Sequence, residues 1–155
     1  MRVFADANIL FSASKRDSLI QRLLAVVRLK GEMVTSEYVL EEARRNLEQK
    51  YPERMEEFER LCNFFQVVEG TAASGEVSLA EKDRPVLHGA IAAGCSHLLT
   101  GDRTHFGHLF CQTVQGVHIP HRQPTDVDRG TGASVKRRFG CFWTLVATRN
   151  SRPSP

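Results

Sequence analysis

The sequence has no long apolar run and few cysteines. No stretch approaches the ~18 consecutive apolar residues needed to cross a bilayer, and Asp6 and Asn8 interrupt the apolar segment after Arg2 that would otherwise resemble a signal peptide. The four cysteines lie far apart and form no CxxC pair; they are Cys62, Cys95, Cys111 and Cys141. We therefore expect a cytoplasmic protein without membrane association, whose cysteines are reduced and packed as small buried side chains.

The main part of the chain also has no excess of positive charge. Residues 126–155 carry six Lys and Arg against two Asp, a net charge of +4. The whole chain has a net charge of +3, so residues 1–125 carry about −1 and are close to neutral. The usual basic footprint of a nucleic-acid-binding protein is therefore absent from the main body. If this body binds nucleic acid, another positive group must attract the phosphates. No GxGxxG motif follows the first apolar run, which argues against a nucleotide-binding Rossmann protein.

The pattern that is present alternates short apolar runs with amphipathic segments, as in an α/β domain whose parallel sheet is covered on both faces. The apolar runs predict strands at 2–5, 33–35, 65–68, 97–100 and 117–119. Apolar residues at helical spacing predict helices at 17–30, 37–50, 52–64 and 85–94, with one or two helical turns at 104–110. The first of these helices is expected to be capped by Asp17 or Ser18 and to end at Gly31. The second is expected to be capped by Ser36.

We expect one domain at 1–126 and a separate C-terminal tail at 127–155. The tail has no clear periodicity and ends in Ser, Arg and Pro. Its segment 141–147 fits a strand, a dimer contact or a stretch that packs nowhere, and we assign it no function.

Acidic residues follow two of the predicted strands. Asp6 comes directly after the first strand, and Asp102 comes just after the fourth. Ligands of open parallel sheets bind at the carboxyl ends of the strands, so the two acids converge if these strands are neighbours. Asp83 precedes the predicted helix at 85–94, from where its side chain can reach the same edge.

A helical wheel separates the two adjacent glutamates after the second strand. At 100° per residue, Glu42 lies about 115° from the centre of the apolar face and Glu41 about 145°. Glu42 is therefore expected nearer the buried edge, and Glu41 is expected to face solvent.

Carboxylates gathered in one cleft repel one another unless a cation neutralises them. Mg²⁺ and Mn²⁺ prefer oxygen ligands and keep several waters, and such an ion can also hold a phosphate. Each acid taken alone is more typical of a turn, cap or solvated surface residue than of a ligand, and Asp83 would favour a helix N-terminus electrostatically. The four acids together, in this order, favour a metal site.

Four stretches resemble the motifs of PIN-domain nucleases, especially the small stand-alone VapC-like toxins of bacterial toxin–antitoxin pairs. They are VFADANILFSA, TSEYVLEEARRNL, EKDRPVLHGAIAAGCSHLLTGDRTHFG and HIPHRQPTD, and the resemblance covers about residues 1–126. It implies a three-layer Rossmann-like sandwich with a mostly parallel sheet of about five strands. It also implies an Mg²⁺- or Mn²⁺-dependent endoribonuclease whose partners are RNA, a small antitoxin protein and a second copy of the chain.

The resemblance also implies roles for individual residues. Asp6, Asp83 and Asp102 would bind the metal, and Glu42 would complete its shell or orient the attacking water. Asn8 and Thr100 would hold carboxylates or waters in place. Arg103, next to Asp102, is either a phosphate contact or a solvated arginine.

Three other interpretations compete with the nuclease. A PIN-like body without catalysis would act as a protein-interaction module, but all four acids are present. Another aspartate-based metallo-phosphohydrolase would need a DxD loop after the first strand, where the third residue is Asn8. Two HxxH pairs, at 105–108 and 118–121, are too weak a pattern to indicate zinc because no Cys or acid completes a tetrahedral set.

Overall fold

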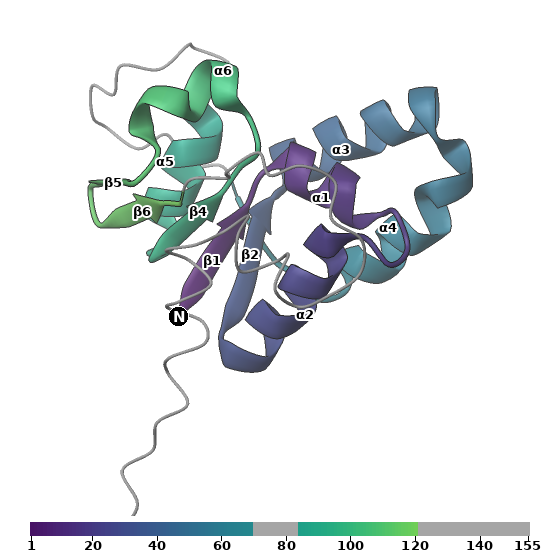
Figure 1. Cartoon of the computed structure of the whole chain (residues 1–155), viewed down its shortest axis with the longest axis horizontal. Coiled ribbons are helices and arrows are strands. Elements are labelled where there is room, and N and C mark those ends of the chain that lie inside the picture. The colour runs from purple at the N-terminus through teal and green to yellow at the C-terminus, as the bar shows by residue number, and fades with distance from the viewer. Residues whose placement is uncertain (70–83, 121–155) are drawn as a thin grey trace, which may run out of the picture.

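A six-stranded, mostly parallel sheet forms the centre of the molecule (Figure 1). The computed structural model describes residues 1–69 and 84–120. The strand order is β3-β2-β1-β4-β6-β5, and β5 pairs antiparallel with β6 while all other pairings are parallel. The strands are β1 (Arg2–Ala5), β2 (Glu32–Ser36), β3 (Gln66–Val68), β4 (His97–Leu99), β5 (Gln112–Val114) and β6 (Val117–Ile119). The predicted α/β sandwich is confirmed.

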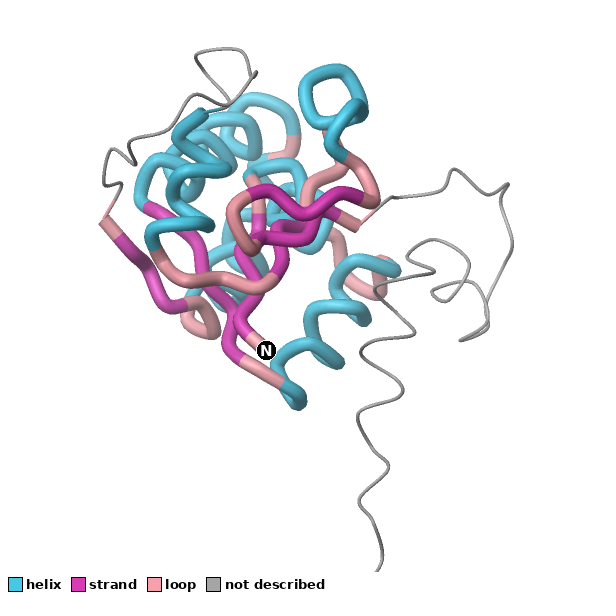
Figure 2. Tube along the Cα trace, turned by 90° about the vertical axis from the view of Figure 1, so that its left-hand side faces the viewer, coloured by secondary structure: helices cyan, strands magenta, loops and turns pink. Residues whose placement is uncertain are grey.

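Helices lie on both sides of this sheet (Figures 1 and 2). α1 packs against α2, α3 and α4, while α5 packs across β1, β2 and β4. Right-handed crossovers account for this division, since the chain winds from β1 out to β3 and then returns across the sheet to β4. The helices are α1 (Ala7–Ala13), α2 (Leu19–Lys30), α3 (Glu37–Lys50), α4 (Met55–Cys62), α5 (Arg84–Ala92) and α6 (Arg103–Phe106).

β1 lies between β2 and β4, so the residues that follow these three strands lie close together. Its register pairs Phe4 with Val34 on one side and with Leu98 on the other. Phe4 is fully buried, and a Cβ added at Gly89 would lie 3.1 Å from the Phe4 ring, so α5 approaches β1 closely there. The strands that Asp6 and Asp102 follow are therefore neighbours, which is the condition under which the two acids converge.

α3 begins where β2 ends. The buried Ser36 is its N-cap, and its side chain accepts a hydrogen bond from the Val39 backbone N–H. A serine oxygen at this position satisfies one of the N–H groups that the first turn of a helix leaves without a partner. Ser36 thereby fixes the start of the helix that carries Glu42.

Replacing Ser36 with Ala is expected to lower the free energy of unfolding by about 1 kcal/mol, because the cap hydrogen bond is lost. Urea denaturation followed by circular dichroism measures this change. Ser36→Thr keeps the hydroxyl and serves as the control. Equal stability of the Ala variant and the wild type would show that the cap contributes nothing.

Two elements were not predicted from the sequence, and one expectation about the cysteines is wrong. α1 follows β1 after a single residue, and β5 forms a hairpin with β6, so the sheet has six strands rather than about five. The segment expected as one helix at 52–64 begins as a 3₁₀ turn, Pro52–Arg54, before α4. Cys95 is buried and Cys62 half-buried, but Cys111 is exposed at a positive φ of 62°.

Within the described ranges, no helix combines the length and the apolar character needed to cross a bilayer. The tail expected at 127–155 and the end of the domain at 126 lie outside the described residues.

Candidate active site

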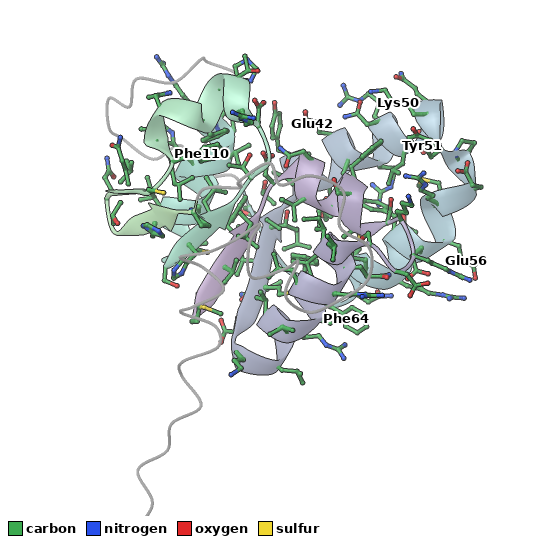
Figure 3. The ribbon with its side chains drawn as sticks, viewed as in Figure 1. Glu42, Lys50, Tyr51, Glu56, Phe64 and Phe110 are labelled. Atoms are coloured by element: carbon green, nitrogen blue, oxygen red, sulfur yellow. The ribbon has the colours of Figure 1, made fainter. Side chains whose placement is uncertain are left out.

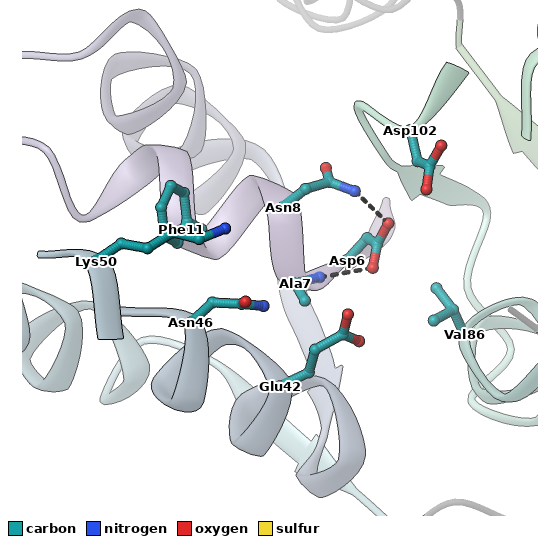
Figure 4. Close-up of a pocket in the computed structure, with 9 residues that line it drawn as sticks. All are labelled: Asp6, Ala7, Asn8, Phe11, Glu42, Asn46, Lys50, Val86 and Asp102. Carbon is teal, nitrogen blue, oxygen red and sulfur yellow. Dashed lines mark hydrogen bonds between the residues drawn. The ribbon is translucent and has the colours of Figure 1, made fainter. Parts of the chain in front are cut away.

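A cleft of about 230 Å³ opens at the carboxyl ends of β1 and β4 (Figure 4). Three of the four predicted acids line it, and they come from different elements: Asp6 follows β1, Asp102 follows β4, and Glu42 lies on α3. The complete lining is Asp6, Ala7, Asn8, Phe11, Glu42, Asn46, Lys50, Val86 and Asp102. The fourth acid, Asp83, lies outside the described residues.

Asp6 is the most buried of these acids, with 6% of its surface exposed. It is the N-cap of α1, and its Oδ1 accepts a hydrogen bond of 2.6 Å from the Ala7 N–H. Burial raises the pKa of Asp6 to about 6, and the negative charge of Glu42 adds to this shift. Hydrogen bonds from Thr100, Ala7 and Asn8 act in the opposite direction but do not cancel it. In the folded protein, ionisation of Asp6 at neutral pH therefore carries an energetic cost.

Asn8 and Thr100 both hold the other oxygen of Asp6. The Asn8 side-chain amide and the Thr100 hydroxyl each donate to Asp6 Oδ2 at 2.6 Å. The Asn8 side-chain oxygen, Oδ1, in turn accepts from the Gly101 N–H at 2.7 Å. Thr100 Oγ1 accepts from the Asp102 N–H at 3.1 Å. This network joins the end of β1 to the loop after β4 and fixes the orientation of the Asp6 carboxylate.

Asp102 is more exposed and lies in a different environment. It is the N-cap of α6, where Oδ1 accepts from the N–H groups of Thr104 and His105. Its Oδ2 lies 2.7 Å from His105 Nδ1. Partial burial alone would raise the pKa of Asp102, but these hydrogen bonds and the His105 charge outweigh it and lower the pKa. Asp102 is therefore fully ionised near neutral pH.

Glu42 is half-buried on α3 and points into the cleft (Figure 4). Its neighbour Glu41 is exposed. The helical-wheel prediction that separated the two glutamates is confirmed. The charge of Glu42 acts on Asp6 across the gap between α3 and α1, which places the two carboxylates in one electrostatic environment.

The donor chemistry of the cleft fits a hard divalent cation, since three carboxylates face one space and one of them is destabilised by burial and a like charge. Among the described residues, no three Asp, Glu, His or Cys side chains lie close enough together to hold an ion as they stand. His105 and two backbone N–H groups occupy the Asp102 oxygens. An ion bound here would therefore draw the carboxylates closer together.

Sequence reasoning missed several residues that line the cleft, among them Phe11, Asn46 and Lys50. Asn46 and Lys50 follow Glu42 at spacings of four and eight residues, so the same helical wheel contains the signal for both. Phe11 lies on α1, which the sequence did not predict. Arg103 is exposed and is not among the residues that line the cleft.

No protein-family model matches the chain, and no curated protein matches it. A solved structure of VapBC2 from Rickettsia felis, bound to a DNA fragment from its promoter, is 14% identical with a TM-score of 0.58 and covers 77% of this chain and 97% of that chain. VapC20 from Mycobacterium tuberculosis, described as a sarcin–ricin loop cleaving toxin, is 16% identical with a TM-score of 0.50 and covers 66% of this chain and 91% of that chain. The likeness at these identities is one of fold, and the chain has the α/β fold of the VapC-type PIN domains.

Proposed function

We propose that the protein is an endoribonuclease that uses Mg²⁺ or Mn²⁺ in the cleft beside Asp6, Glu42 and Asp102. One observation carries the proposal: three carboxylates from three separate elements line one cleft at the carboxyl ends of β1 and β4. The fold supports it, since VapC20, which shares this fold, is described as a sarcin–ricin loop cleaving toxin.

In this proposal Asp6, Asp102 and Asp83 bind the ion, and Glu42 completes its shell or orients the attacking water. The bound ion supplies positive charge that polarises the phosphodiester and lowers the pKa of a water molecule. Asn8 and Thr100 hold Asp6 Oδ2 in a fixed orientation, leaving the carboxylate little rotational freedom to lose when it binds. An adjacent cation favours the ionised form of Asp6 and offsets the effect of burial on its pKa.

The biological role that we propose is that of the toxin in a toxin–antitoxin pair, with a small antitoxin protein as partner and a homodimer as the assembly. This chain shares its fold with the solved structure of VapBC2, and that likeness supports the antitoxin partner. A small DNA-binding protein encoded beside this chain, which restores growth when the two are expressed together, would support the pairing.

The activity test uses the purified full-length chain and a labelled single-stranded RNA. Cleavage is expected with Mg²⁺ or Mn²⁺ and is expected to stop on addition of EDTA, because the cleft holds carboxylates and only one cationic side chain among its described residues. Cleavage that continues in EDTA, or no cleavage of any RNA with either ion, contradicts the proposal.

Metal binding is also expected to stabilise the fold. An ion that binds only the native state adds about 1.4 kcal/mol to the free energy of unfolding at a concentration ten times its dissociation constant. Thermal melting with increasing Mn²⁺ measures this effect independently of activity. Asp102→Asn should reduce it, and Glu41→Gln, which alters an exposed acid on the same helix as Glu42, should leave it unchanged.

A further inference from the structure

The cleft has a second end, which the proposed cleavage chemistry does not use. Phe11, Asn46 and Lys50 line it, on the side of Glu42 away from Asp102 (Figure 4). Lys50 is the one cationic side chain among the described residues that line the cleft. The cleft therefore runs from acidic to basic along its length.

α3 sets the spacing between these two ends. Glu42, Asn46 and Lys50 recur every four residues and face the same side of the helix. Eight residues of α-helix correspond to about 12 Å. Figure 3 shows Glu42 and Lys50 on the same rim of the molecule. The backbone positions of Glu42 and Lys50 therefore lie two helical turns apart, so the two ends of the cleft can hold neighbouring phosphates of one strand.

An aromatic side chain adjoins this cation. The Phe11 ring is half-buried and lies 5.9 Å from the Lys50 ammonium, measured to the ring centroid. Tyr51 meets Phe11 edge to face at 5.7 Å, and the Arg54 guanidinium lies 3.7 Å over the Tyr51 ring. Tyr51 thus supports Phe11 from beside the cleft. An aromatic ring beside a cation in a groove is the arrangement that binds single-stranded nucleic acid, with the base on the ring and the phosphate at the cation.

We propose that Lys50 and Phe11 form a subsite for a nucleotide of single-stranded RNA adjacent to the one that is cut. Lys50 contacts a phosphate that is not cleaved, and Phe11 contacts the neighbouring base. Asn46, between the acidic and basic ends, can donate to or accept from the connecting sugar. This subsite rests on the proposed nuclease function for its substrate class. Its Lys50 adds a positive charge to a cleft whose other charged lining residues, among those described, are carboxylates.

Lys50 is tested by binding rather than by cleavage. The dissociation constant of a fluorescein-labelled RNA dodecamer is measured by anisotropy at several salt concentrations in EDTA, where the RNA stays intact. Loss of one phosphate contact lowers the slope of log K against log salt by about 0.7 for a single strand. Lys50→Met is expected to show this decrease together with weaker binding. Lys30→Met is the matched control, because Lys30 also ends a helix but does not line the cleft.

Phe11 is tested with RNAs that each carry one abasic nucleotide. Removal of the base that stacks on Phe11 is expected to weaken binding by the wild type about fivefold or more at one position. Phe11→Leu keeps an apolar side chain and should show no such position. Thermal melting checks that the Leu variant is folded. If the variant loses affinity at the same position as the wild type, no base contacts Phe11.

The outcomes separate this subsite from the nuclease proposal. A Lys50→Met slope equal to that of Lys30→Met, or a wild type that does not bind the RNA, overturns the subsite. If Lys50→Met lowers the slope of log K against log salt but the wild type cleaves no RNA with Mg²⁺ or Mn²⁺, the subsite is supported and the nuclease proposal is overturned.

Discussion

Asp102→Asn is expected to reduce metal-dependent RNA cleavage by more than about 100-fold while leaving the fold intact. Asn is as good an N-cap as Asp, so the variant keeps an acceptor for the Thr104 and His105 N–H groups that Asp102 now binds. It loses the negative charge that would bind the cation. The expected loss exceeds the 10- to 100-fold typical when only a hydrogen-bonding partner of a metal ligand is removed.

This substitution separates the two roles of Asp102. If Asp102 acts only as a helix cap, the Asn variant retains both its stability and its activity. If it binds the metal, stability is retained and activity is lost. The measurement is the rate of RNA cleavage with saturating Mn²⁺, beside a thermal melt of the metal-free protein. Activity within a few fold of the wild type would show that Asp102 is not a ligand.

The two neighbouring glutamates provide a matched pair for the same assay. Glu42→Gln removes a carboxylate from the cleft, whereas Glu41→Gln removes one from the exposed side of the same helix. Both substitutions change the net charge equally and keep the helix. Only Glu42→Gln is expected to lower the cleavage rate. Equal rates for the two variants would exclude Glu42 from the reaction.

The metal-free protein is expected to lose stability as the pH rises from about 4 to above 6. The pKa of Asp6 is about 6 in the folded protein against an ordinary value of 3.8, so between these values the folded state binds more protons than the unfolded state. The free energy of unfolding therefore falls as the pH rises. A difference of about two pKa units corresponds to about 3 kcal/mol from this one group, reached once the pH exceeds 6.

Asp6→Asn isolates this contribution. The Asn side chain does not ionise, so the difference in unfolding free energy between the variant and the wild type should shift in favour of the variant by about 2.5 kcal/mol between pH 4 and pH 7.5. Part of the absolute gain is offset because an amide has one acceptor oxygen. It cannot accept both from the Ala7 N–H, which now reaches Asp6 Oδ1, and from the Asn8 and Thr100 donors, which now reach Asp6 Oδ2. Urea titrations in EDTA at several pH values measure the difference. A difference that stays constant across this range would mean that Asp6 titrates normally.

The sequence contains enough information to predict the position of most acids in the cleft. The alternation of strands and helices indicates a parallel sheet, in which the carboxyl ends of the strands all lie on the same side. Asp6 and Asp102 could therefore be assigned to that side, and the structure shows that β1 and β4 are neighbours. The wheel also separated Glu42 from Glu41, because α3 is a regular helix with a clear apolar face.

The missed elements are short or lack a clear pattern. α1 comes one residue after β1, so its apolar residues continue those of the strand and no change of period marks its start. β5 is mostly exposed and has few apolar residues. Its turn to β6 uses Gln115 and Gly116 at positive φ, and Gln lacks the preference that Asn and Asp have for this conformation. Phe11 could not be assigned to the cleft without α1.

The contact between Asp6 and Thr100 spans 94 residues of sequence. β1 is made before its partner β4, which follows α5 in the chain. The loop after β4 completes the cleft, so a growing chain has no assembled pocket until that loop has been translated. A nuclease with this topology would acquire its cutting geometry only then, and the ribosome would carry an incomplete form before that point.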